Sequence, residues 1–164
     1  MAVTSPYLND TGRLADVIAA IQAMGTYKFY KLDFEGWADR ITANKNQAFY
    51  WKNVFEQHPE FFRLDGERKR ASPVWRRQYP KRFHVDLEKR LTPAELEALS
   101  DDEKKRVSRD PLSPEDIKAL VDTAISLHSR ALESEHEGRW WIPLVSSGVG
   151  GLVGAIVGAF LRAK

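Results

Sequence analysis

The chain has no cysteine among its 164 residues, which excludes a disulfide framework and a thiolate-ligated metal site. It also lacks a His-Glu-x-x-His pair, a glycine-rich phosphate loop and a nucleophile elbow. The histidines, at positions 58, 84, 128 and 136, do not have the close spacing that metal sites use. We therefore predict no catalytic residue, no metal and no cofactor, and a protein that is not an enzyme.

The amino terminus lacks both the basic start and the apolar stretch of a secretory signal. We accordingly expect the amino-terminal domain to lie in the cytoplasm.

Charge is absent from residues 140–161, a run that lies between Arg139 and Arg162. As a helix this run would be roughly 33 Å long, which matches the hydrocarbon thickness of a bilayer. The sequence thus predicts one carboxyl-terminal transmembrane helix in a segment spanning 139–164, a single-pass membrane protein, and membrane lipid as a partner.

Small residues repeat every four positions within this run and resemble the glycine-zipper motif of self-associating membrane helices. The resemblance implies a homo-oligomer, although glycine and alanine are also simply common in membrane helices. The residues that would form the contact face are Ser146, Gly150, Gly154 and Gly158, with Gly151 and Ala155 beside them.

Hydrophobic periodicity divides the first 84 residues into short elements. Leu14, Val17 and Ile21 predict a first amphipathic helix, residues 27–31 a short extended piece, and Asp33 the cap of a second helix. A third helix would bury Trp51 among its inner residues, and Asp65-Gly66 predicts a hairpin turn.

The order helix, strand, helix, helix, hairpin resembles a winged-helix domain of the helix-turn-helix group over residues 11–78. The resemblance implies that the third helix reads DNA bases. Its outward side chains would be Gln47, Tyr50, Lys52 and Asn53.

Residues 61–84 carry eight basic and two acidic side chains, with aromatic residues between them. Clustered guanidinium groups suit a phosphate backbone, so we predict a nucleic-acid or partner-binding site. The acidic helices that follow, the headgroups of a membrane, or no partner at all remain open alternatives. The basic residues are Arg63, Arg68, Lys69, Arg70, Arg76, Arg77, Lys81 and Arg82.

Three cap patterns follow, at Thr92-Pro93-x-Glu95, Ser100-x-x-Glu103 and Ser113-Pro114-x-Asp116, and predict three successive helices. The third would carry an apolar stripe from 117 to 132, which is either a coiled-coil seam or a face packed on the amino-terminal domain.

The predicted fold class is mainly α with a small β-hairpin, divided into a winged-helix-like domain (1–84), a charged helical connector (85–138) and the transmembrane anchor (139–164). The predicted function is that of a membrane-tethered recognition and assembly protein, whose soluble domain binds DNA or an unidentified cytoplasmic protein. The alternative is an oligomerising membrane effector that perturbs the bilayer and is gated by that domain.

Overall fold

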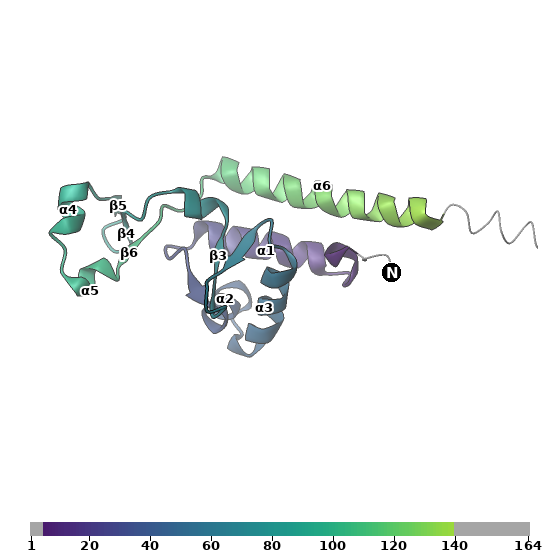
Figure 1. Ribbon diagram of the computed structural model, residues 1–164, viewed down its shortest axis with the longest axis horizontal. Helices are drawn as coiled ribbons and strands as arrows, with labels where there is room; N and C mark the ends of the chain where they lie inside the picture. Colours follow the sequence, from purple (N-terminus) through teal and green to yellow (C-terminus); the bar gives the residue numbers. More distant parts are fainter. Residues whose placement is uncertain (1–4, 140–164) are drawn as a thin grey trace, which may run out of the picture.

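The computed structural model describes residues 5–139 of the chain. After a 3-10 turn at Pro6–Leu8, three helices build the amino-terminal half: α1 (Arg13–Thr26), α2 (Phe34–Thr42) and α3 (Ala48–Gln57), with a 3-10 turn at Lys45–Gln47 before α3. Three short strands, β1 (Leu32–Asp33), β2 (Phe62–Leu64) and β3 (Arg70–Pro73), form an antiparallel sheet in the order β1-β3-β2. The predicted sequence of helices and hairpin in this region is therefore confirmed (Figure 1).

The strand predicted at 27–31 is found instead at Leu32–Asp33, so that prediction is wrong in position. Backbone carbonyls at Tyr27 and Lys28 accept hydrogen bonds from the side chain of Arg76 rather than from a neighbouring strand. The cap predicted at Asp33 is confirmed, since its carboxylate accepts a 2.7 Å hydrogen bond from the Gly36 amide.

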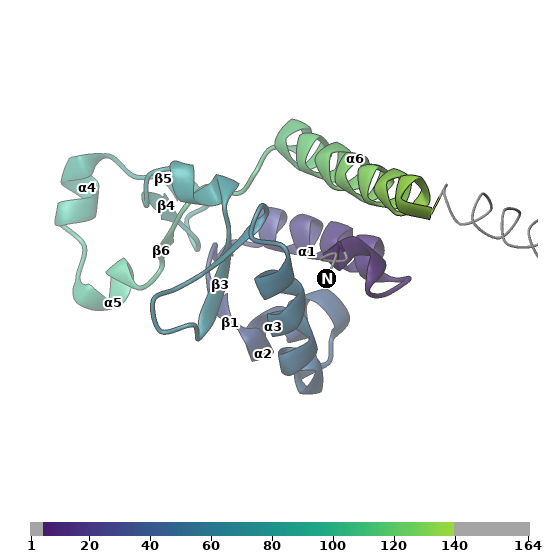
Figure 2. The same ribbon diagram turned by 45° about the vertical axis from the view of Figure 1, so that its right-hand side comes forward.

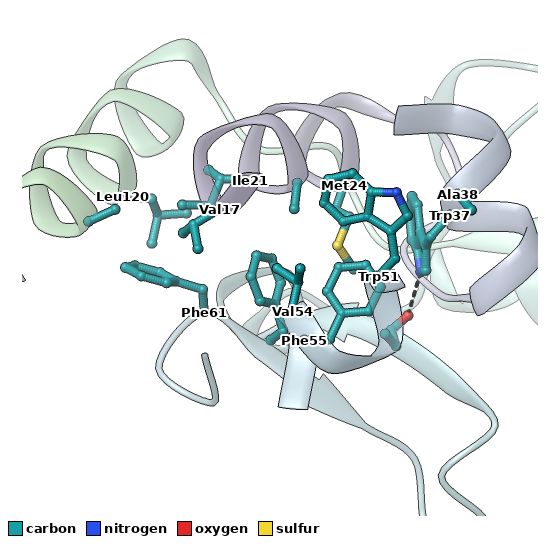
Figure 3. Close-up of a cluster of buried hydrophobic side chains, with 14 of the residues drawn as sticks. Val17, Ile21, Met24, Trp37, Ala38, Trp51, Val54, Phe55, Phe61 and Leu120 are labelled. Atoms are coloured by element: carbon teal, nitrogen blue, oxygen red, sulfur yellow. Dashed lines mark hydrogen bonds between the residues drawn. The ribbon is translucent and has the colours of Figure 1, made fainter. Parts of the chain in front are cut away.

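An aromatic core lies between the three helices and the inner face of the sheet (Figure 3). Trp37, Trp51 and Phe55 are almost fully buried there, together with apolar residues of α1. Trp37 also donates from Nε1 to the carbonyl of Ala71, which fixes α2 against the central strand (Figure 3). A polar ring nitrogen inside an apolar core needs such a partner.

The predicted hairpin forms between β2 and β3, joined by residues 65–69, which we call the hairpin loop. The left-handed residue in this loop is Arg68, with φ of 55°, and not Gly66, on which the sequence prediction rested. Pro73 is tolerated in the central strand because β1 pairs only with Arg70 and Ala71, which leaves the proline with one neighbouring strand.

A long helix, α6 (Pro114–Arg139), lies along α1 in both views (Figures 1 and 2). Leu120 and Ala124 are buried in the same core as the first three helices, so the predicted apolar stripe packs on the amino-terminal domain. Gly25 permits the close approach, because a Cβ there would lie 3.2 Å from Ile117 Cγ1. The core thus includes residues of α6 as well as residues of the amino-terminal half.

Between these parts, the chain leaves the core and forms a small projection, with α4 and α5 at its far end (Figure 1). It follows a 3-10 turn at Trp75–Gln78 and contains β4 (Phe83–His84), β5 (Lys89–Arg90) and β6 (Val107–Ser108), paired in the order β5-β4-β6. The sequence did not predict this second sheet. Its helices α4 (Pro93–Glu97) and α5 (Asp101–Lys104) begin at the predicted capping boxes, which are confirmed.

No helix within residues 5–139 is both long enough and apolar enough to cross a bilayer. The longest, α6, carries charged side chains such as Lys118 and Asp122 on its exposed side. This finding contradicts the predicted transmembrane architecture and the single-pass membrane location, and those predictions are wrong. The run at 140–161, with its small-residue face, lies outside the described residues.

Candidate nucleic-acid interface

Helix α3 is oriented by its buried side, where Trp51, Val54 and Phe55 enter the core. Its outer side carries Phe49, which is 73 % exposed, and the half-buried Lys52 and Asn53. We did not predict Phe49 as a surface residue. The spacing 49, 52, 53 is that of a single helix face, so the outward positions of Lys52 and Asn53 were the signal that could have identified it.

Two of the four side chains predicted to read bases are hydrogen-bonded to other side chains of the domain. The Tyr50 hydroxyl donates to Asp16 of α1, and the guanidinium of Arg13 lies 5.7 Å from the Tyr50 ring. Burial and the bond to Asp16 raise the pKa of Tyr50 to about 12. Gln47 accepts a 2.8 Å hydrogen bond from the Thr42 hydroxyl. Of the other two predicted readers, the side chain of Asn53 has no hydrogen bond or ion pair among the described residues, and Lys52 has a 3.9 Å ion pair with Glu56.

The hairpin loop is joined to α3 by a chain of charges. Glu56 of α3 pairs with Arg68 of the loop at 2.7 Å, and Lys52 lies 3.9 Å from the same carboxylate. Within the loop Lys69 pairs with Glu67 at 3.0 Å. We call the outer side of α3 and the β2–β3 hairpin together the α3–hairpin surface. The pairing places Arg68 and Lys52 beside each other on this surface, although pairs this exposed add little stability.

Arg76 does not belong to the binding surface, although the sequence placed it there. Its side chain is fully buried, and its guanidinium donates to the carbonyls of Met24, Tyr27 and Asp110 at 2.9, 2.5 and 3.0 Å. It also reaches the carbonyls of Lys28 and Arg109. Burial lowers the pKa of Arg76 to about 10, so the group stays charged at neutral pH. Arg76 is a structural residue that holds the end of α1 to the segment before α6.

The remaining predicted basic residues lack a carboxylate partner within the described part of the chain. No ion pair among the described side chains, residues 5–135, involves them. Most are exposed, and Arg82 is half-buried. These residues are Arg63, Arg70, Arg77, Lys81 and Arg82.

The acidic helices α4 and α5 do not neutralise the hairpin. Glu95 pairs with Lys89 at 2.9 Å and Asp102 with Lys105 at 2.7 Å, both within the projection. The backbone amide and hydroxyl of Thr92, with Lys89, lower the pKa of Glu95 to about 2. The carboxylate of Glu103 likewise accepts hydrogen bonds from the backbone amide and the hydroxyl of Ser100. Among the described residues, no ion pair therefore joins these acidic helices to the hairpin, and the alternative of intramolecular docking lacks that support.

The structure brings to the hairpin two cations that the sequence reasoning missed. Lys31 pairs with Asp65 of the hairpin loop at 3.1 Å. Arg109, from the segment before α6, donates through Nη1 to the carbonyls of Arg77 and Tyr79 and lies over the ring of Tyr30. Sequence position gave no signal for Arg109, because the contact joins residues about thirty positions apart.

Comparison with protein-family models, with curated proteins and with solved structures gave no match. The interpretation of the α3–hairpin surface therefore rests on its own geometry. Among the side chains that the structure describes, those of residues 5–135, no group of three or more His, Cys, Asp or Glu could hold a metal ion. The small-residue contact face predicted between Ser146 and Gly158 lies outside the described residues, and self-association through it stays a prediction.

Proposed function

We propose that residues 13–73 are a winged-helix-type domain that binds duplex DNA through the α3–hairpin surface. The order of elements and the sheet order β1-β3-β2 support the resemblance, because they place α3 and a hairpin loop on one module. In this arrangement α3 enters the major groove and the hairpin loop lies against the backbone.

The observation that carries the proposal is the unneutralised positive charge of the hairpin. Arg63 and Arg70 are exposed and have no carboxylate partner among the described residues, while the chain's acidic helices form their own pairs. Exposed arginines without internal partners are suited to phosphate oxygens, which take two parallel hydrogen bonds from one guanidinium.

The outer side of α3 supplies groups that contact base edges. Lys52 donates hydrogen bonds to guanine, Asn53 pairs with adenine, and Phe49 offers an apolar contact for a thymine methyl. The carboxylate of Glu56 repels a phosphate at this surface, but its charge is shared between Arg68 and Lys52. The net result is a basic edge at the hairpin beside a nearly neutral helix.

Fluorescence anisotropy of the full chain with a labelled duplex tests the proposal at several salt concentrations. We expect log K to fall linearly with log salt, since each neutralised phosphate releases about 0.9 counterions. The double change Arg63→Gln and Arg70→Gln should reduce that slope by about 2. Arg130→Gln, which removes a charge from the exposed side of α6, is the matched control and should leave the slope unchanged.

Phe49→Ala separates base contact from charge. It should weaken binding to some sequences without changing the salt slope, because no charge is lost. Absence of binding at low salt would contradict the proposal. It would favour a protein partner instead. The observation that supports a protein partner is the exposed ring of Phe49.

A further inference from the structure

A pocket of about 190 Å³ lies at the base of the hairpin loop, against the turn at Asp65 and Gly66. Its polar lining comes from residues 30–31, from the hairpin and the turn after it (65–77), and from the segment before α6. The polar lining residues are Tyr30, Lys31, Asp65, Ser72, Arg77 and Arg109.

The lining carries three cations and one carboxylate. The carboxylate of Asp65 is already occupied, because it accepts from the amides of Lys69 and Arg70 at 2.9 and 3.2 Å and pairs with Lys31. Arg77 and Arg109 have no carboxylate partner among the side chains of residues 5–135. The pocket therefore keeps an excess of positive charge, which favours an anionic ligand.

Arg109 is held in one orientation. Its Nη1 donates to the carbonyl of Arg77 at 2.9 Å and to that of Tyr79, and its guanidinium carbon lies 5.0 Å from the Tyr30 ring centre. Its Nε is buried and has no hydrogen-bond partner. Because Nε has almost no accessible surface, the donor of Arg109 that an oxyanion in the pocket can reach is Nη2, for which the described residues show no hydrogen bond.

The size of the pocket suits a small anion. A volume near 190 Å³ corresponds to about six water molecules at roughly 30 Å³ each, which is room for a phosphate group and its ester atoms. We propose that this pocket binds a phosphate group, with Arg77 and Arg109 as the anion-binding side chains. Because Asp65 and Gly66 belong to the hairpin loop, the source is either a backbone phosphate of bound DNA or a free phosphate ester.

Titration of the full chain with inorganic phosphate, at constant ionic strength set by chloride, tests the pocket without DNA. Amide resonances of Lys31, Gly66 and Ser72 should shift and saturate in the millimolar range. Arg77→Gln should weaken this binding about tenfold, because it removes one charge-assisted contact. Arg130→Gln, which also removes one positive charge, should change it less than twofold.

Two results would overturn the phosphate site: no saturable shift at these amides, or an affinity for phosphate that Arg77→Gln leaves unchanged. Arg77 is exposed, so this variant is expected to fold, and its thermal unfolding checks that directly.

DNA titrations of the same variants then identify the source of the phosphate. If Arg77→Gln loses duplex affinity in parallel and phosphate competes with the duplex, the pocket binds a backbone phosphate. This assignment rests on the proposed function. Unchanged duplex affinity with retained phosphate binding assigns it to a free phosphate ester. If DNA binding fails altogether while phosphate still binds, the proposed function falls and the pocket stands.

Discussion

At the scale of single residues, the buried guanidinium of Arg76 should contribute strongly to the stability of the fold. It satisfies five backbone carbonyls from two segments that are far apart in the sequence. Replacing it by methionine keeps much of the volume and leaves those carbonyls unpaired. We expect Arg76→Met to lower the free energy of unfolding by about 3 kcal/mol in urea titrations.

The neighbouring Arg77 provides the control for this prediction. Arg77→Met removes the same charge one position along the chain, but from an exposed side chain. Its effect should stay within about 0.5 kcal/mol. Equal losses in the two variants would show that charge, and not the carbonyl contacts, determines the stability at this place.

Glu60 makes the stability depend on pH in the acid range. Its Oε1 accepts from the Tyr7 hydroxyl at 3.1 Å and lies 3.0 Å from Nδ1 of the buried His58. Desolvation alone would raise the pKa of Glu60, but hydrogen bonds from His58, its own backbone amide and Tyr7 lower it overall. Because the folded-state pKa is the lower one, the unfolded chain binds the proton first as pH falls.

The stabilisation from Glu60 is therefore complete above the ordinary glutamate pKa of about 4.3, and is lost as pH falls through the lower folded-state value. We expect Glu60→Gln to cost about 1 kcal/mol at pH 7, and the difference from wild type to shrink below pH 4. Urea unfolding across this range measures it. Glu67→Gln on the hairpin loop is the control. If the difference in unfolding free energy between Glu60→Gln and wild type persists at pH 3, the expected link between the Glu60 pKa and stability is wrong.

At the scale of elements, α6 is predicted to be part of the folding core. Leu120 is 5 % exposed and packs with the helices of the first half, whereas Ile125 on the same helix is 44 % exposed. Leu120→Ala should lower the free energy of unfolding by about 3 kcal/mol, because it leaves a cavity. Ile125→Ala should change it by less than about 1 kcal/mol. Similar small effects at both positions would mean that α6 is not cooperative with α1.

Elements with local causes were predictable from the sequence, and those that depend on distant contacts were not. The capping boxes at Thr92 and Ser100 are complete within four residues, so their helices could be located. The strand after α1 was misplaced because Arg76, some fifty residues away, takes the carbonyls of residues 27 and 28. The second sheet joins strands of two residues each, which are too short to give an alternating pattern.

The candidate site likewise contains features that the sequence could predict and features that depend on distant contacts. Composition was enough to find the basic hairpin, since eight cations in 24 residues need no structure to be noticed. It could not show that Arg76 points inward or that Tyr50 is bonded to Asp16, because both depend on how α1 packs. Arg109 was missed because only the folded chain brings it to Arg77 and Tyr30.

At the scale of the whole molecule, the projection and the core should differ in local stability. The core cluster joins residues from Tyr7 to Ala71 with Leu112 and residues of α6, but includes none of residues 80–108. In the projection, the buried apolar side chains are Val85, Leu91 and Val107. Since opening free energy follows the apolar area that is exposed, the projection should open well below the cost of global unfolding.

Native-state hydrogen exchange tests this difference. The amides of Val85 and Leu91, bonded to the carbonyls of Arg106 and Arg82, should exchange through a local opening, while that of Ile21 in α1 should require global unfolding. Asp86→Asn breaks the bidentate pair with Arg106 and should speed exchange in the projection without affecting Ile21. Equal opening free energies at all three amides would show one cooperative unit, in which the contacts of Arg76 and Arg109 couple the projection fully to the core.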